Sequence, residues 1–215
     1  MSGDSALVAE ALRVNARYVE EVVIGWGLCP WAAQAWREGA VARRVLVDPA
    51  PAQTAEIDGV LAFIDEIAPN PGVSIGLVIF PRATLTEAAW GTFAERVRRA
   101  DRARRAPGES APFLLAAFHP KTGENGENGE TGESATAVVN VANAGALVPF
   151  IRRTPDPMLQ LVRASLLDRL APAGRDLSGE IARANLAAVN ARTPAALDAL
   201  IAEIRSDRDA SYARL

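Results

Sequence analysis

The sequence predicts an α/β protein with a small, mainly parallel sheet of three to four strands, covered by helices and followed by a helical C-terminal part. Three short apolar runs, residues 41–47, 74–80 and 113–118, have the length and the flanking glycine or proline of buried strands. Two amphipathic segments separate these runs, as in right-handed parallel crossovers. Apolar residues then recur at helical spacing to the C-terminus.

Length and composition are those of one globular domain. The 215 residues are 49% hydrophobic and 23% charged, with a net charge of −3. These values allow a real core, and we expect a single domain over residues 1–215. The charge does not indicate nucleic acid, no apolar run spans a membrane, and no secretory pattern opens the chain. The expected compartment is therefore the cytoplasm, with no nucleic-acid or membrane partner.

The segment around the single cysteine joins two predicted helices. Apolar spacing over residues 8–26 predicts an amphipathic helix closed by the glycines at its end. Pro30 predicts a short helix over residues 30–38 with Cys29 at its cap. Free N–H groups and the helix dipole there would lower the thiol pKa from about 8.5 to roughly 3.5–7.5. The alternative is an inert, buried thiol, the usual state of a single cysteine.

The three predicted strands end beside prolines. A helix capped by Thr54 is expected between the first two strands, and a capping box of Thr84 and Glu87 begins the next helix. If the strands are parallel, Asp48, Arg82 and His119 leave the sheet at one carboxyl edge, where α/β proteins bind ligands. One antiparallel strand, as in a split β-α-β arrangement, would remove this inference.

Residues 121–135 contain a Gly-Glu triplet repeat. Because its residues 123–134 carry no apolar side chain, we expect a disordered acidic loop, with calcium or partner binding as the alternative. The apolar residues 135–147 are ambiguous, and Val138, Val139 and Val141 allow an edge strand.

An arginine-rich segment precedes the C-terminal helices. Thr154 or Asp156 is expected to cap a helix whose buried face is Leu159, Val162, Leu166 and Leu170. Arg152 and Arg153 lie before this helix start and Arg163 lies within the helix, where guanidinium groups can bind an anion. For Arg153, anion binding and bracing of the loop stay open, and for Arg163 bracing is preferred. Two further helices follow, residues 178–192 with Asn185, and one capped by Thr193 and Pro194.

Three segments, residues 23–32, 117–120 and 153–163, together resemble a bacterial family of unknown function catalogued under the number 1415. The matching positions are Cys29, Pro30, His119, Pro120, Arg153, Pro155, Pro157, Arg163 and, in a later helix, Asn185. The chain departs from the family pattern where Arg152 replaces an asparagine, Gln160 a histidine and Ala164 a glutamate. The family has no assigned activity, so the resemblance implies site residues and no reaction.

These observations predict a site in which Cys29 and His119 are catalytic, with sulfur and ring less than about 6 Å apart. The expected ligand-binding residues are Arg153, Arg152, Arg82, Arg163, Asp48, Trp31 and Asn185. The expected function is a cysteine-dependent hydrolase, transferase or thiol oxidoreductase that acts on a small anionic substrate.

Two alternatives stay open. In the first, the same cysteine and histidine bind a ligand, haem iron or a metal without catalysis, although no cofactor is predicted. In the second, the acidic loop or the arginines of residues 96–105 contact a protein partner.

Overall fold

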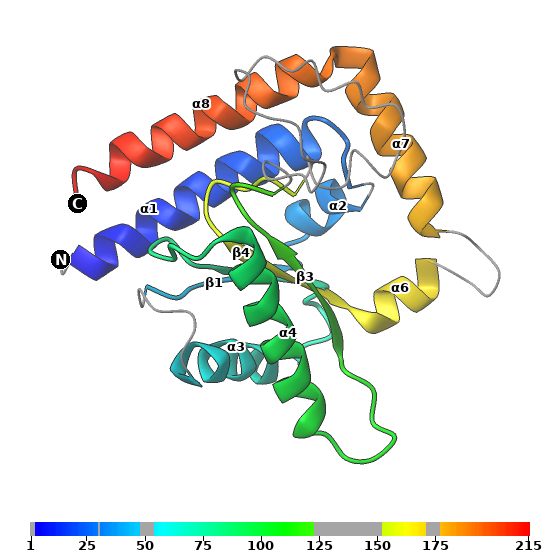
Figure 1. Cartoon of the computed structure of the whole chain (residues 1–215). Coiled ribbons are helices and arrows are strands. Elements are labelled where there is room, and N and C mark those ends of the chain that lie inside the picture. The colour runs from blue at the N-terminus through cyan, green and yellow to red at the C-terminus, as the bar shows by residue number, and fades with distance from the viewer. Residues whose placement is uncertain (1–2, 30, 48–53, 123–151, 171–176) are drawn as a thin grey trace.

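The computed structural model describes residues 3–29, 31–47, 54–122, 152–170 and 177–215, and it confirms the α/β class and the helical C-terminal part (Figure 1). In chain order the elements are α1 (Gly3–Arg17), the π-helix η1 (Tyr18–Ile24), α2 (Ala32–Arg37), β1 (Val41–Val45), α3 (Thr54–Ile67), β2 (Ile75–Ile79), α4 (Glu87–Ala103), β3 (Phe113–Phe118), β4 (Met158–Arg163), α6 (Ala164–Leu170), α7 (Leu177–Arg192) and α8 (Pro194–Tyr212).

The described sheet has four strands in the order β1-β2-β4-β3. β1 and β2 pair in parallel, whereas β4 lies between β2 and β3 and pairs with both in antiparallel fashion. The prediction of a mainly parallel sheet was therefore wrong in its pairing. β1, β2 and β3 still share one direction, because β2 and β3 both oppose β4. The arrangement is the split one that the sequence left open as the alternative to a parallel sheet.

The residues of β4 were predicted to begin a helix, and this prediction was wrong. Leu159 and Leu161 pack into the core on the side of α3 and α4, while Met158 packs on the opposite side of the sheet. Both faces of a central strand are apolar, so the sequence shows no polar alternation that would separate a strand from a helix. The helix begins only at Ala164, as α6.

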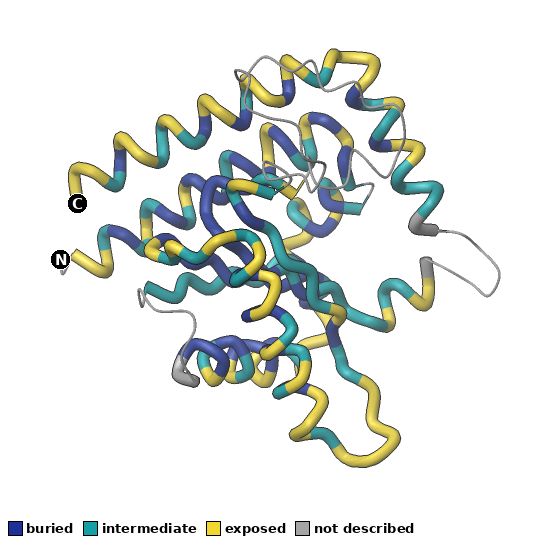
Figure 2. Tube along the Cα trace, in the orientation of Figure 1, coloured by how far each residue is buried: buried dark blue, intermediate teal, exposed yellow. Residues whose placement is uncertain are grey.

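Two hydrophobic clusters fill the two faces of the sheet. The first lies under α1, η1, α2, α7 and α8, and the second under α3 and α4 (Figure 1). β2 is buried along its whole length. Figure 2 shows buried segments in the interior of the molecule and exposed residues along the outer sides of helices such as α8. α1 and α8 lie side by side with the two chain ends at the same side of the molecule.

Most predicted helices are confirmed with shifted ends. The Thr193 hydroxyl accepts from the Ala196 N–H and caps α8 as expected, and α7 matches residues 178–192. The cap of α4 is Thr86, two residues after the predicted one. Among the described residues, no helix is both long enough and apolar enough to cross a membrane.

Several predictions concern residues outside the described ranges. They are the acidic repeat from residue 123 onward, the edge strand at Val138, Val139 and Val141, the role of Asp48 and the helix start at Pro30. The side chain of Thr54, the predicted cap of α3, also lies outside them.

Candidate ligand-binding site

A cavity of about 370 Å³ lies on the sheet face that η1, α2 and α7 cover. Strand side chains line it on one side, namely Val41, Ile75, Leu77, Ala116, Phe118, Met158, Gln160 and Val162. The N-terminal elements contribute Tyr18, Val19, Val23, Leu28, Cys29, Trp31, Ala32 and Trp36, and the remaining wall is Arg152, Ile181, Ala182 and Asn185. The lining is thus mainly apolar and aromatic, with few polar groups, as is usual for small-molecule sites.

The π-helix η1 shapes one wall of this cavity. In an α-helix, residues five apart point about 140° apart, because each residue turns the chain by about 100°. In η1 the Gly25 N–H donates to the Glu20 carbonyl five residues earlier, at 2.9 Å. Such wide turns bring residues five apart, here Tyr18 and Val23, to one side. Both of these side chains line the cavity.

Two glycines allow the chain to leave η1. A Cβ on Gly25 would lie 2.4 Å from the Glu21 carbonyl oxygen, a distance that no side chain tolerates. Gly27 has a φ of 66°, in the left-handed region that glycine adopts without strain. The predicted helix end at these glycines is therefore confirmed, and the chain turns directly toward Cys29.

Cys29 lines the cavity and has intermediate exposure. Burial raises the pKa of its thiol, while hydrogen bonds from the backbone N–H groups of Trp31 and Ala32 act in the opposite direction. Desolvation outweighs these hydrogen bonds, so the neutral thiol is the favoured form at pH 7. The cap of α2 is Trp31, with no side-chain hydrogen bond at the cap, so the prediction that Cys29 caps this helix was wrong.

Asn185 is the most deeply buried polar side chain of the lining, with 2% of its surface exposed. Among the described residues, its amide oxygen Oδ1 has no hydrogen-bond partner. Buried polar groups are normally paired, and leaving one unpaired costs about 1–3 kcal/mol. The amide therefore has an unused acceptor beside an apolar cavity.

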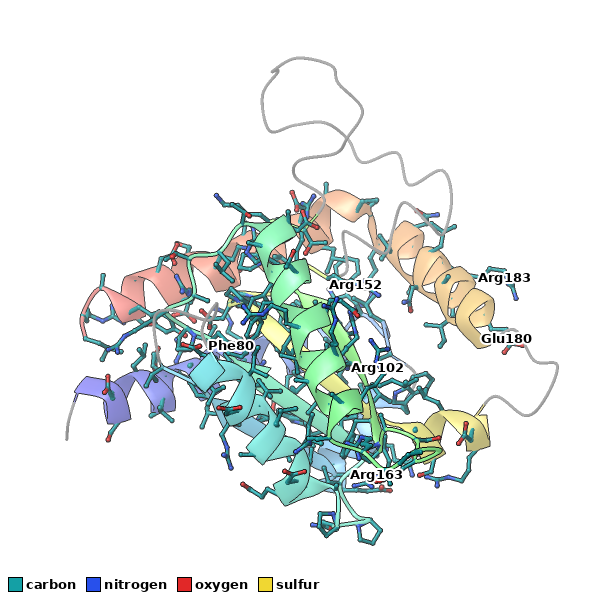
Figure 3. All side chains as sticks on the ribbon, turned by 60° about the horizontal axis from the view of Figure 1, so that its bottom comes forward. Phe80, Arg102, Arg152, Arg163, Glu180 and Arg183 are labelled. Carbon is teal, nitrogen blue, oxygen red and sulfur yellow. The ribbon has the colours of Figure 1, made fainter. Side chains whose placement is uncertain are left out.

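Arg152 supplies the only charged side chain among the described lining residues. Its guanidinium lies over the Phe118 ring at 5.9 Å from the centroid and is exposed at the outer end of the site. Figure 3 shows Arg152 between the sheet and α7. Its backbone carbonyl accepts from the His119 N–H at 3.2 Å, which ties residue 152 to the end of β3.

His119 is not part of the cavity lining. Its Nε2–H donates to the Leu85 carbonyl at 2.9 Å, and its Nδ1 accepts from the Lys121 N–H at 3.1 Å. Burial lowers the pKa of this imidazole and so favours its neutral form, and the hydrogen bond that Nδ1 accepts places the ring proton on Nε2. Both ring nitrogens thus bind backbone, and neither is available to a thiol, haem iron or a metal unless one of these bonds breaks.

Three other predicted arginines contact protein groups outside the cavity. Arg163 donates to the carbonyls of Ile67, Ala68, Asn70 and Val73 at the end of α3, so it braces that helix as preferred. Arg153 donates to Thr122 and pairs with Asp198, and Arg82 pairs with Asp4. Of the predicted site residues, the cavity brings together Cys29, Trp31, Arg152 and Asn185.

The cavity also contains residues that sequence reasoning missed, above all Tyr18, Trp36, Phe118 and Gln160. Gln160 stands where the resembled family has a histidine, and it lies on β4 with its neighbours Met158 and Val162 two residues away on either side. A strand interpretation of residues 158–163 would have placed these three side chains on one face. In the described part of the chain, no cluster of histidine, cysteine and carboxylate groups could hold a metal ion.

Comparison with known proteins gives one match. The signature of the family described as "Protein of unknown function (DUF1415)" covers residues 10–199. No curated protein and no solved structure matches the chain. The matched range runs from within α1 to the first part of α8, and it contains every described residue of the cavity lining. The chain thus belongs to the DUF1415 family.

Proposed function

We propose that this protein reversibly binds a small, mainly apolar molecule in the cavity beneath η1, α2 and α7. The observation that carries the proposal is the buried amide of Asn185 in the cavity lining, whose oxygen has no hydrogen-bond partner among the described residues. If the side chain turns this oxygen toward the cavity, a ligand that donates an O–H or N–H to it would remove the cost of its burial.

The size of the cavity sets the size of the ligand. About 370 Å³ corresponds to the volume of about twelve water molecules. This is at the lower end of the range of small-molecule sites. The ligand is therefore the size of one or two fused rings, and its apolar body contacts the strand side chains.

A neutral probe with one hydroxyl tests this proposal. Isothermal titration calorimetry with 2-naphthol should show one saturable site, and Asn185→Leu should weaken binding about tenfold, because the hydroxyl loses its acceptor. The matched control is Asn190→Leu, on the exposed side of the same helix, which should leave the affinity unchanged. Absence of binding to the unmodified protein, or equal effects of the two substitutions, would refute the proposal.

A second proposal keeps the cysteine-dependent enzyme. It is favoured by the position of Cys29 in the cavity lining, where the backbone N–H groups of Trp31 and Ala32 act to lower the thiol pKa against the effect of burial. The described lining offers no carboxylate or imidazole as a base, so a thiolate would have to arise from local electrostatics alone. Alkylation by iodoacetamide over a pH series decides between the two proposals. A midpoint above about 8.5 indicates a buried thiol of a binding protein, and one below about 7.5 indicates an activated nucleophile.

A further inference from the structure

We propose that the ligand is a hydroxylated aromatic carboxylic acid, with its carboxylate at Arg152 and its hydroxyl at Asn185. This inference rests on the proposed function and names the chemical class that the same cavity selects.

The charge of the lining favours an anion. No aspartate or glutamate is among the described lining residues, and Arg152 contributes one positive charge. Within the described ranges no carboxylate pairs with the Arg152 guanidinium, which contacts the Phe118 ring instead. A planar guanidinium binds a carboxylate through two parallel N–H donors, so a ligand carboxylate matches both its charge and its geometry.

The single positive charge of Arg152 also favours a carboxylate over a phosphate monoester as the anion that binds. A phosphate monoester carries a charge of about −1.5 to −2 at pH 7. Placing it beside one guanidinium in a mainly apolar cavity would leave part of that charge uncompensated, which is costly. A monoanionic carboxylate leaves no such excess.

The position of the polar groups orients the ligand. Arg152 is exposed, whereas Asn185 is almost completely buried, so the charged end lies at the mouth and the hydroxyl lies inside. Four aromatic side chains, Tyr18, Trp31, Trp36 and Phe118, also line the cavity. Aromatic rings pack preferentially in offset-stacked or edge-to-face arrangements, which favours a flat ring system as the body of the ligand.

Four naphthalene derivatives test this assignment by calorimetry. We expect 6-hydroxy-2-naphthoate to bind about tenfold more tightly than 2-naphthol, and 2-naphthyl phosphate and 2-naphthylmethylamine to bind more weakly than the hydroxynaphthoate. Arg152→Gln should reduce hydroxynaphthoate binding to the level of 2-naphthol and leave 2-naphthol unchanged. Arg183→Gln is the matched control, since this exposed arginine extends from the outer side of α7 (Figure 3) and should change neither affinity.

The outcomes separate this inference from the proposed function. If 2-naphthol binds but the carboxylate adds nothing, or if Arg152→Gln and Arg183→Gln act alike, the acid assignment is overturned and the binding proposal stands. Tighter binding of the phosphate or the amine also overturns it. If none of the four probes binds, both proposals fail. As a second measurement, hydroxynaphthoate affinity should fall with added NaCl while 2-naphthol affinity does not.

Discussion

Two buried polar side chains, Asn185 and His119, stand in opposite situations. His119 has both ring nitrogens paired with backbone groups, so its burial is compensated within the protein. Asn185 lines the cavity, and among the described residues its amide oxygen has no partner that would compensate its burial. The sequence marked both residues as candidates, because residue type and motif indicate chemistry. The sequence could not show which side chain has an unused hydrogen-bond donor or acceptor, because the partners come from distant segments of the chain, as Leu85 does for His119.

The buried amide of Asn185 leads to a prediction for the free energy of unfolding. Asn185→Leu replaces a buried amide, whose oxygen has no partner among the described residues, with an apolar group of similar size, so the ligand-free protein should become more stable by about 1–2 kcal/mol. The measurement is the free energy of unfolding in urea. Asn190→Leu, at an exposed position, should change it by less than about 0.5 kcal/mol. A clear loss of stability in Asn185→Leu would mean that the amide already has a partner in the free protein.

The depressed pKa of His119 predicts a pH effect on stability. The unfolded state takes up a proton as the pH falls through about 6.5, whereas the folded state, with its lowered pKa, does not. The unfolding free energy should therefore be constant above that pH and decrease from about pH 6.5 downward. Urea titrations at pH 7.5 and 5.5 measure this loss. His119→Gln keeps a donor for Leu85 without titrating and should show a smaller decrease; an identical decrease would assign the effect to other groups.

At the scale of elements, the end of η1 shows what a sequence pattern can and cannot predict. The glycines near Cys29 correctly predicted where the helix ends. The switch from α to π hydrogen bonding was not predicted, because a helical spacing of apolar residues looks the same until the extra residue enters the turn. The structure explains why position 25 requires glycine. The backbone there lies too close to the Glu21 carbonyl for a Cβ, while its φ is an ordinary helical one. Gly25 thus contributes to the end of η1 through this close backbone approach and not through a side-chain contact.

Two glycine substitutions should have opposite effects. Gly25→Ala places a methyl group 2.4 Å from a backbone oxygen and should reduce the unfolding free energy by about 1–3 kcal/mol, because backbone must shift. Gly91→Ala, in the middle of α4 with open space around it, should increase it by about 0.5–1 kcal/mol. Thermal or urea unfolding measures both. Equal stability of the two variants would contradict the close contact at η1.

At the scale of the whole molecule, strand β4 is the element that the sequence did not predict, and the pairing of the sheet depends on it. Three strands, most helices and the layering of helices over a sheet followed from apolar runs and caps. The pairing did not, because β4 is apolar on both faces and looks like a helix start. Its neighbour Asp156 was predicted to cap a helix. Instead, its carboxylate accepts from Arg208 Nε at 2.9 Å and from the Tyr212 hydroxyl at 2.7 Å, which joins the approach to β4 to α8.

This junction should contribute more to stability than the ion pairs between α1 and α8. Tyr212→Phe removes a hydrogen bond to a buried carboxylate and should cost about 1–3 kcal/mol of unfolding free energy. Arg13→Gln removes an exposed pair with Asp207 and should cost less than about 1 kcal/mol, with a salt-dependent difference. Urea unfolding in low and high NaCl compares the two. A larger loss from Arg13→Gln would reverse this ranking.

The π-helix also has a genetic consequence. Its turns close over one residue more than an α turn, and one residue corresponds to one codon. Deleting a single codon within residues 18–24 would restore the ordinary helical register and rotate the flanking segments relative to each other by about 100°. Substitutions in the wall can change the cavity only by the size of a side chain. A one-codon insertion or deletion here would reshape the cavity wall in a single mutational event.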